Sequence, residues 1–469
     1  MNLFNNFSKY KNNIAVINEN NEAINYHSLS LFIEKFIANI KKRHLVFLIC
    51  KNNLETIVGY LGFIKSNCVT TLIDEKTNDH FLLNIISKYK PHYIFISNKK
   101  KILLKGYSTE FIFFNYSLLK RTKEIKKKLH NDLMLLMSTS GTTGSTKFVR
   151  QSYVNLSSNT KSISDFLNIS ELDNAITTLP MSYVYGLSVI NTHFENGGSI
   201  TLNNLSIIQK GFWEKIYINK VTNFAGVPYT YEIIDKLDLT KFNLKFLKYT
   251  TQAGGKIPVK IVKNIISKYE KSDIKLIIMY GASEATSRMT YLSWRDVKKK
   301  PESIGKEIPG GKIWLENKFK KKINLINENG ELIYKGKNVS LGYATNIKDL
   351  NKGNVNNSIL RTGDIGYRDK DGYYYLVGRK DRFVKINGLR INLSEVEDII
   401  SKMNIKSMCL KGDYNKILIY VLEKNKIEIL KKNLSKSLNM HPSSFTIQII
   451  KEFPLNMNYK TSYKKLEID

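Results

Sequence analysis

Apolar runs of strand length alternate with longer segments of helical spacing through the first 280 residues. Helices are predicted over residues 28–40 and 54–65, and strands over residues 44–50 and 93–96. Further strand-like runs cover residues 133–137, 199–202, 223–227 and 275–279. This alternation is typical of α/β proteins, in which helices cover a largely parallel sheet. We therefore expect an α/β fold with mixed or parallel sheets and flanking helices.

The pattern changes after Pro301 to short strands closed by turn signals, which predicts a β subdomain. Further along, Ser394 and Glu397 have the spacing of a capping box, which predicts the start of a helix. A strand at residues 417–422 and a helix at residues 427–438 complete the pattern of a small α+β domain.

The chain of 469 residues is longer than one hydrophobic core usually organises. We expect residues 1–380 to form a large N-terminal domain that includes the β subdomain. Residues 381–469 are expected to form a small, mobile C-terminal domain.

The composition excludes several classes of protein. With 42% hydrophobic and 24% charged residues, the chain cannot be disordered throughout. Its 73 basic and 41 acidic residues give a net charge of +32, but the basic runs are scattered, so we expect no nucleic-acid partner. Cys50, Cys68 and Cys409 lie far apart, which fits neither a disulfide framework nor a zinc site.

The beginning of the chain has no apolar stretch of the kind found in signal peptides. No window reaches the roughly 18 apolar residues that a membrane-spanning helix needs. We therefore expect no membrane span and a cytoplasmic location.

A segment rich in hydroxyls and glycines, from Ser138 to Lys147, directly follows an apolar strand. Glycines allow backbone N–H groups to approach a phosphate, hydroxyls add hydrogen bonds, and the lysine adds charge. The segment is not a Walker A loop, because Thr146 precedes the lysine where that motif has glycine, and Phe148 replaces the metal-binding Ser or Thr. Phosphate binding is the functional interpretation, and an ordinary surface loop is the alternative.

Tyr280-Gly281-Ala282-Ser283-Glu284 follows the strand predicted at residues 275–279. Open α/β sheets bind ligands at the carboxyl ends of their strands, where this aromatic ring, hydroxyl and carboxylate would lie. Tyr280 can stack on a base, and Glu284 can hold Mg²⁺ beside phosphates. A solvated turn is the alternative.

Charged residues punctuate the β subdomain and the end of the chain. Asp364 and Arg379 stand in turn-like segments, and Lys385 follows closely. Lys460 lies in a polar stretch near the C-terminus. Each of these residues taken singly is compatible with a solvated surface position.

Together, in this order, the segments resemble the adenylate-forming superfamily, which includes acyl-CoA synthetases, adenylation domains and luciferases. The resemblance extends from residues 25–29 to Lys460. It implies an N-terminal domain that binds AMP, ATP and Mg²⁺ as cofactors, and a C-terminal lid. The implied activity is that of an acid–thiol ligase, which forms an acyl-adenylate with release of pyrophosphate and then a thioester.

The resemblance also implies roles for individual residues. Those that would bind the nucleotide are Thr139, Ser140, Gly141, Thr142, Thr143, Gly144, Lys147, Gly254, Gly255, Tyr280, Gly281, Asp364 and Arg379. Ser283 would lie near the α-phosphate, Glu284 would bind Mg²⁺, and Lys460 would be the catalytic lysine. Asp381 would be the hinge, and Lys385 would approach the thiol tunnel in the second half-reaction.

The argument for Lys460 also rests on charge. A carboxylate that attacks the α-phosphate brings two anions together, and a cation that contacts both stabilises the transition state. Removal of one such preorganised partner typically costs about 2.7–4 kcal/mol.

Some positions depart from the family pattern. Thr146 replaces the usual proline, Phe148 and Tyr459 replace glycines, and Ser462 stands where an acidic residue is common. The charged groups are intact, so we interpret the chain as an active enzyme. A nucleotide-binding homologue without adenylation activity is an alternative.

The expected substrate pocket contains Tyr183, Tyr185, Gly186, Val227, Pro228, Gln252 and Ala253. Tyr183 lies about where amino-acid-activating members carry aspartate, so an α-ammonium group would be left unpaired. This disfavours a stand-alone amino-acid adenylation enzyme without excluding it. The tyrosines indicate a small-molecule carboxylate that is small or aromatic.

No carrier domain follows Lys460 in the sequence, so the thiol is expected to come from outside. Coenzyme A and the phosphopantetheine of a free acyl carrier protein both fit a basic surface. Three hypotheses stay open: a carboxylate ligase, an inactive nucleotide-binding homologue, and a basic nucleic-acid binder that only the bulk charge supports.

Overall fold

The computed structural model describes residues 3–125, 128–138, 147–386, 389–413, 416–423, 426–438, 440–455 and 462–466. The chain divides into two compact units. Unit 1 contains Met1–Pro301, Glu307–Lys312 and Lys335–Leu360, and unit 2 contains Glu302–Lys306, Ile313–Tyr334 and Arg361–Asp469. The boundary predicted after residue 380 lies inside unit 2, which groups the β subdomain with the C-terminal residues.

The first sheet of unit 1 has the strand order β20-β9-β8-β4-β3-β5-β7-β6. Its strands are β3 (Leu45–Cys50), β4 (Val69–Asp74), β5 (Tyr93–Ser97), β6 (Tyr107–Phe113), β7 (Tyr116–Arg121), β8 (Leu133–Ser138), β9 (Phe148–Ser152) and β20 (Gly342–Ala344). The central strands β8, β4, β3 and β5 are parallel, and the outer ones are antiparallel. Every residue of β3 is buried, as expected for a parallel strand covered on both faces.

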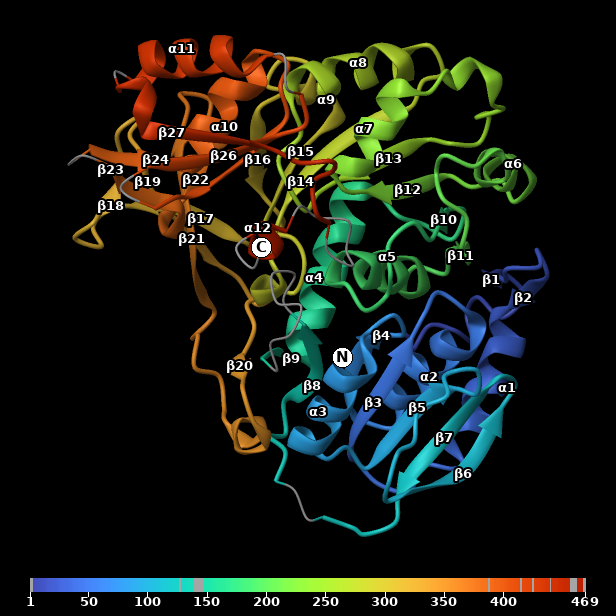
Figure 1. Cartoon of the computed structure of the whole chain (residues 1–469). Helices are drawn as coiled ribbons and strands as arrows, with labels where there is room; N and C mark the ends of the chain where they lie inside the picture. The colour runs from blue at the N-terminus through green and yellow to red at the C-terminus, as the bar shows by residue number, and fades with distance from the viewer. Residues whose placement is uncertain are drawn as a thin grey trace. The chain divides into compact units, whose positions relative to one another are not determined.

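The second sheet of unit 1 contains, in order, β15-β14-β13-β12-β10-β11-β1-β2 (Figure 1). The strands are β1 (Ile14–Ile17), β2 (Ala23–Asn25), β10 (Asn174–Ile176), β11 (Ser199–Thr201), β12 (Asn223–Gly226), β13 (Tyr249–Gln252), β14 (Lys275–Tyr280) and β15 (Thr290–Leu292). All pairs from β14 to β1 are parallel, whereas β15 and β2 are antiparallel to their neighbours.

Helices cover both sheets of unit 1. They are α1 (Tyr26–Ile37), α2 (Leu54–Lys65), α3 (Asp79–Tyr89), α4 (Tyr153–Leu167), α5 (Val184–Glu195), α6 (Lys210–Ile218), α7 (Pro228–Lys236), α8 (Val259–Glu270) and α9 (Trp294–Val297). Short 3-10 helices occur at η1 (Leu239–Lys241), η2 (Ser283–Ala285) and η3 (Ile347–Asn351). Helices α2 and α5 share one core with both sheets, and Tyr60 of α2 donates a hydrogen bond to Asn191 of α5 at 2.9 Å.

Unit 2 contains a sheet with the order β18-β17-β19-β21-β22-β16. Its strands are β16 (Ser303–Glu307), β17 (Lys312–Glu316), β18 (Lys322–Ile323), β19 (Gly330–Lys335), β21 (Ile359–Arg368) and β22 (Tyr374–Arg379). The remaining elements are η4 (Lys380–Arg382), β23 (Phe383–Ile386), β24 (Leu389–Asn392), α10 (Leu393–Lys402), β25 (Ser407–Lys411), β26 (Ile417–Val421), α11 (Ile427–Leu438), η6 (Pro442–Ser444), β27 (Phe445–Ile449) and α12 (Tyr463–Leu466). Strands β25, β26 and β27 form a small sheet, and apolar residues of α10 and α11 share its core.

The expected α/β class is confirmed. Cys50, Cys68 and Cys409 are free and buried. The capping box predicted at Ser394 is wrong, because the N-cap of α10 is Asn392, whose side chain accepts a hydrogen bond from the Ser394 backbone at 2.9 Å. The helix therefore starts before Ser394. In the described part of the chain, no helix is long and apolar enough to span a membrane.

Candidate functional site

The carboxyl ends of β12, β13 and β14 bring three predicted segments to one edge of the second sheet. The parallel register pairs Gly226 with Gln252, and Gln252 with Ile278. The segments that leave these strands are Val227-Pro228, Ala253-Gly254-Gly255 and Tyr280-Gly281. Ligands of open α/β sheets bind at such an edge.

Direct contacts hold the first two segments together. The Ala253 backbone N–H donates to the carbonyl of Gly226 at 3.1 Å, and the Gln252 side chain donates to the carbonyl of Gly255 at 2.8 Å. Gly254 has a φ of +90°, which favours glycine, and a Cβ at Gly255 would lie 3.0 Å from the Pro228 ring. The two glycines therefore leave no side chain of their own at this part of the edge.

The turn after β14 carries Ser283 and Glu284 in a tightly fixed loop. A Cβ at Gly281 would overlap the carbonyl oxygen of Ser287, so only glycine fits there. Thr286 has a φ of +63°, an uncommon value for a β-branched residue. Its hydroxyl donates to the Asn338 carbonyl at 2.6 Å, which helps to hold this strained conformation.

Glu284 and Lys147, two predicted site residues, are linked through Tyr343 of β20. The Tyr343 hydroxyl donates to Glu284 Oε1 at 2.7 Å, and Lys147 Nζ lies 3.4 Å from the centre of the Tyr343 ring. Tyr343 was not among the predicted site residues, because the pairing of β20 with β9 joins segments that lie far apart in the chain. No local pattern marks this residue.

The residues around Glu284 fit magnesium better than zinc. Among the described residues, no group of three or more His, Cys, Asp or Glu side chains is arranged to hold a metal. Mg²⁺ usually keeps several waters and binds one or two carboxylates together with substrate phosphates. The single Glu284 carboxylate beside Lys147 suits that mode of binding.

The predicted phosphate loop spans the connection between β8 and β9. These strands are antiparallel, and Ser138 pairs with Phe148. The residues Thr139, Ser140, Gly141, Thr142, Thr143 and Gly144 lie outside the described part of the chain. Phe148 is buried, and its ring packs 5.2 Å from that of Tyr89, so the departure at this position has a structural role.

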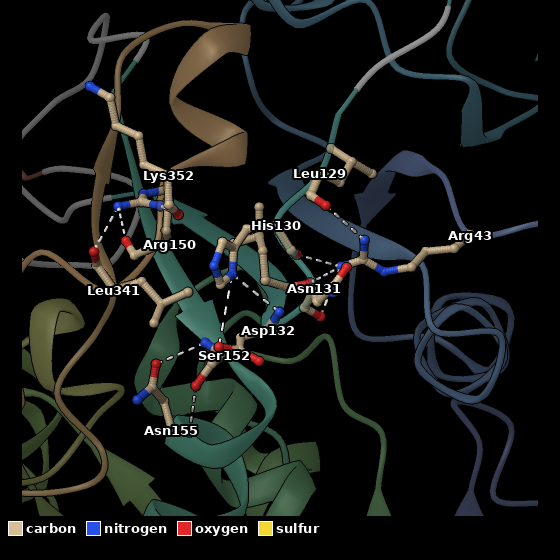
Figure 2. Close-up of polar contacts among 12 residues, drawn as sticks. Arg43, Leu129, His130, Asn131, Asp132, Arg150, Ser152, Asn155, Leu341 and Lys352 are labelled. Atoms are coloured by element: carbon tan, nitrogen blue, oxygen red, sulfur yellow. Dashed lines mark hydrogen bonds and ion pairs between the residues drawn. The ribbon is translucent and has the colours of Figure 1, made fainter.

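Arg150 of β9 fixes the segment of residues 341–353, and Figure 2 shows it beside Leu341 and Lys352. Its buried guanidinium donates to the carbonyls of Leu341 at 2.7 Å, Gly353 at 3.1 Å and Tyr343 at 3.1 Å, and also to that of Lys352. The backbone carbonyls around this arginine thus replace an acidic partner and tie the 341–353 segment to β9.

The predicted pocket tyrosines lie at the start of α5. Tyr183 and Tyr185 are both buried, with ring centres 6.2 Å apart. The Tyr185 hydroxyl donates to the Thr251 carbonyl at 2.8 Å. Burial raises the pKa of Tyr185 to about 12, although the nearby Arg288 lowers it. A Cβ at Gly186 would overlap the Pro180 carbonyl, so this glycine serves the packing of α5.

Arg288, which the sequence analysis also missed, lies over the Tyr185 ring with its guanidinium carbon 3.8 Å from the ring centre. Its side chain is almost fully buried, and burial lowers the pKa of the guanidinium. The arginine stands four residues after Glu284 in an otherwise small and polar turn, but nothing in the sequence marks its burial.

Asp364 and Arg379 face each other in unit 2. They are directly opposed in the antiparallel pair β21–β22, and Arg379 Nη1 lies 3.6 Å from Asp364 Oδ1. Gly363, with a φ of +72°, precedes the aspartate. The structure therefore brings this predicted pair together, with Arg379 about half exposed.

The predicted hinge residue Asp381 lies in η4, and Lys385 lies in β23, where it is paired with Arg390 of β24. Next to Asp381, Arg382 Nη2 lies 2.8 Å from Glu397 Oε1, and Tyr463 donates to the same carboxylate at 3.0 Å. Burial raises the pKa of Glu397, and Arg382 opposes this shift. Lys460 lies outside the described residues.

Comparison with known proteins identifies the family. The sequence model of the family described as AMP-binding enzyme matches residues 3–344. A 2-succinylbenzoate–CoA ligase of Lactococcus lactis is 25% identical over 91% of each chain. A luciferin 4-monooxygenase of Photuris pensylvanica is 25% identical over 77% of this chain and 71% of its own length. Further curated relatives, all CoA ligases, are matched over about half of their own length.

A solved structure agrees in fold over the whole chain. The o-succinylbenzoate CoA synthetase of Bacillus subtilis, in complex with its acyl-adenylate intermediate, has a TM-score of 0.79 and 18% identity, with 100% of this chain and 98% of that chain covered. The resemblance expected from the ordered motifs is confirmed: the chain belongs to the AMP-binding enzyme family.

Proposed function

We propose that the protein is an ATP-dependent carboxylate ligase that forms an acyl-adenylate and then an acyl thioester. The observation that carries the proposal is the meeting of predicted nucleotide-binding and substrate-pocket segments at the carboxyl ends of β12, β13 and β14 in a member of this family. The CoA-ligase names of several relatives support the same activity.

In the first half-reaction, a carboxylate oxygen of the acid attacks the α-phosphorus of ATP. A P–O bond forms, the bond to the bridging oxygen of the β-phosphate breaks, and pyrophosphate leaves. The Gly254–Gly255 backbone and the Tyr280 ring are proposed to enclose the adenine, and Ser283 to lie near the α-phosphate. In unit 2, Asp364 is proposed to bind the ribose hydroxyls, with Arg379 in support.

The phosphates are proposed to lie between the loop of residues 139–147 and the turn that carries Glu284. Lys147 supplies charge to the β- and γ-phosphates, and Glu284 holds the magnesium ion. A magnesium ion held there would neutralise charge on the leaving pyrophosphate. Tyr343, which donates to Glu284 at 2.7 Å, orients that carboxylate.

Lys460 is proposed to contact both the attacking carboxylate and the α-phosphate. In the second half-reaction a thiolate attacks the carbonyl carbon of the acyl-adenylate, and AMP leaves. We propose that residues 381–469 rotate at Asp381 between the steps and bring Lys385 and Gly388 toward the thiol.

The thiol acceptor is proposed to be coenzyme A. The phosphopantetheine of a free acyl carrier protein is the alternative, and its docking to a basic surface should weaken as ionic strength rises. A cytoplasmic location stays a prediction from the sequence.

The testing experiment is carboxylate-dependent exchange of pyrophosphate into ATP, with a panel of short-chain, aromatic, dicarboxylic, hydroxy and amino acids. Lys460→Ala and Glu284→Ala provide the controls. We expect exchange with one class of acid and a loss of about a hundredfold or more in both variants. Absence of exchange across the panel, with ATP still bound, would instead support the inactive nucleotide-binding homologue.

A further inference from the structure

Arg288 is a buried cation without an acidic partner among the described residues. Its guanidinium donates to Met279 Sδ at 3.2 Å and to the Ser287 hydroxyl, and it lies on the Tyr185 ring. A thioether, a hydroxyl and an aromatic ring are weak partners for a buried charge, which normally requires a counter-charge or several strong acceptors.

Arg150 shows how this chain satisfies a buried arginine that has a structural role. Four backbone carbonyls accept hydrogen bonds from the Arg150 guanidinium. For Arg288, none of the described residues offers a carbonyl or carboxylate oxygen to the guanidinium. The strong acceptors that a buried arginine needs are therefore missing at Arg288.

A second donor faces the same small cavity. The hydroxyl of Tyr249 is buried and has no hydrogen-bond partner in the described structure, and both Tyr249 and Arg288 line a cavity between α4, α5 and strands β12–β14. Thr192, Asn223 and Thr251 add polar groups to its wall. The Asp173 carboxylate, whose charge acts on Tyr249, is already paired with Lys248 at 3.1 Å.

The cavity lies next to the proposed adenylation site. The Arg288 Cα lies directly against Gly281, since a Cβ on that glycine would be 2.8 Å away. Arg288 belongs to the same turn as Ser283 and Glu284, and its side chain follows β14 back to Met279, one residue below Tyr280. One strand residue corresponds to about 3.3 Å. Arg288 therefore lies only a few carbon–carbon bonds below the sheet edge. The cavity that it lines measures about 10 Å³, so a carboxylate enters only as the surrounding side chains move apart.

We propose that Arg288 and Tyr249 bind a second carboxylate of the substrate, so that the enzyme activates a short dicarboxylic acid. The inference rests on the proposed function and specifies its substrate class. The bound carboxylate supplies the acceptors that Arg288 lacks, and the tyrosine hydroxyl donates to it. A neutral or long-chain acid leaves the cation unpaired and is selected against.

The experiment compares each dicarboxylic acid with its own monomethyl ester in the exchange assay. We would use malonic, succinic and glutaric acids, since the esters keep the length and one reactive carboxylate. The wild-type protein is expected to prefer one free diacid over its ester by at least thirtyfold in kcat/KM. Arg288→Met should abolish that preference, mainly through KM for the diacid, and Tyr249→Phe should reduce it about threefold to tenfold.

Arg150→Met is the matched control, because it removes a buried arginine that has strong acceptors. It should lower the melting temperature and leave the diacid preference intact, whereas Arg288→Met should not lower the melting temperature. An unchanged preference in Arg288→Met, or a wild-type preference for the esters, overturns the inference and leaves the proposed function standing.

A direct binding measurement distinguishes failure of the proposed ligase function from failure of the inferred carboxylate site. If no acid supports exchange, the proposed function fails, and calorimetric titration of the wild-type protein with succinate alone then tests the anion site. Binding that is lost in Arg288→Met supports the site, and equal or absent binding in both proteins overturns it.

Discussion

Tyr343 is the residue that couples the magnesium and phosphate positions of the proposed site. Its hydroxyl donates a hydrogen bond to Glu284, and Lys147 Nζ lies over its ring. Tyr343→Phe removes only the hydrogen bond, so we expect kcat to fall about threefold to tenfold, consistent with about 1 kcal/mol for a partly exposed contact. The measurement is pyrophosphate exchange at several magnesium concentrations.

Tyr343→Leu is the matched control, because it also removes the ring under Lys147. It should further raise KM for ATP, since Lys147 loses its support. Equal kinetics in the two variants would mean that the ring contributes nothing, and wild-type activity in Tyr343→Phe would contradict the role of the hydroxyl.

The substitution Gly281→Ala tests whether the turn after β14 tolerates a side chain at this position. In Gly281→Ala the Cβ overlaps the Ser287 carbonyl, which displaces the turn that holds Glu284 and Arg288. We expect exchange activity to fall at least a hundredfold, and stability to fall by about 1–3 kcal/mol. Gly211→Ala in α6 is the control: its Cβ meets only a flexible leucine side chain at 3.2 Å, so activity should persist. Near-normal activity in Gly281→Ala would show that the turn can relax.

At the scale of elements, the sequence predicted best where periodicity alone decides. The helices expected at residues 54–65 and 427–438 coincide with α2 and α11. In α11 the buried residues Leu430 and Leu434 recur at helical spacing, whereas α2 is buried on nearly all sides. The strand expected at residues 275–279 matches β14 to within one residue, since a buried parallel strand is a continuous apolar run.

The sequence failed where a contact joins distant segments. The Tyr343–Glu284 bond requires β20 to pair with β9, and no local pattern encodes that register. The burial of Arg288 was equally invisible, because an arginine in a polar turn normally stays solvated. The start of α10 was misplaced for a different reason: Asn392 and Ser394 are both good N-cap residues, and backbone geometry chooses between them.

Asp349 of η3 makes the stability of the segment that follows β20 depend on pH under acidic conditions. Burial alone would raise the pKa of Asp349, but hydrogen bonds from Lys352 and from Thr345 outweigh it and lower the pKa well below its usual range. An aspartate in the unfolded chain has a pKa of about 3.9, so a lower pKa in the folded state means that the ionised Asp349 stabilises the fold above about pH 3.9. This stabilisation is lost as the pH falls below that value and through the pKa of the folded state.

We therefore expect Asp349→Asn to be about 1–2 kcal/mol less stable at pH 7, because the cap and the ion pair weaken. The difference in free energy of unfolding between the wild-type protein and Asp349→Asn should narrow as the pH falls from about 4 toward 3. Urea denaturation midpoints measured at each pH would show this. A gap that is constant with pH would mean that Asp349 acts without its charge.

At the scale of the molecule, the two half-reactions place opposite demands on the C-terminal residues. In the proposed mechanism, Lys460 would lie at the site during adenylation and away from it during thioester formation, so residues 381–469 would need a hinge, which we place at Asp381. Arg382, Glu397 and Tyr463 form a half-buried polar cluster directly after it, so the chain beyond Asp381 is tied to α10. Rotation is therefore expected to concentrate at the hinge backbone.

Asp381→Pro tests whether the backbone at Asp381 is the hinge, because the proline ring fixes φ near −65° and restricts the preceding residue. If the variant keeps the adenylating arrangement, pyrophosphate exchange should stay within about threefold of wild type, whereas thioester formation should fall about a hundredfold, equivalent to about 2.7 kcal/mol of barrier. Asp381→Ala keeps the torsional freedom and should retain both steps. Loss of both steps in Asp381→Pro but not in Asp381→Ala would indicate either a locked thioester-forming arrangement or misfolding. A lowered melting temperature would identify misfolding. Retention of both steps in Asp381→Pro would place the hinge elsewhere in the chain.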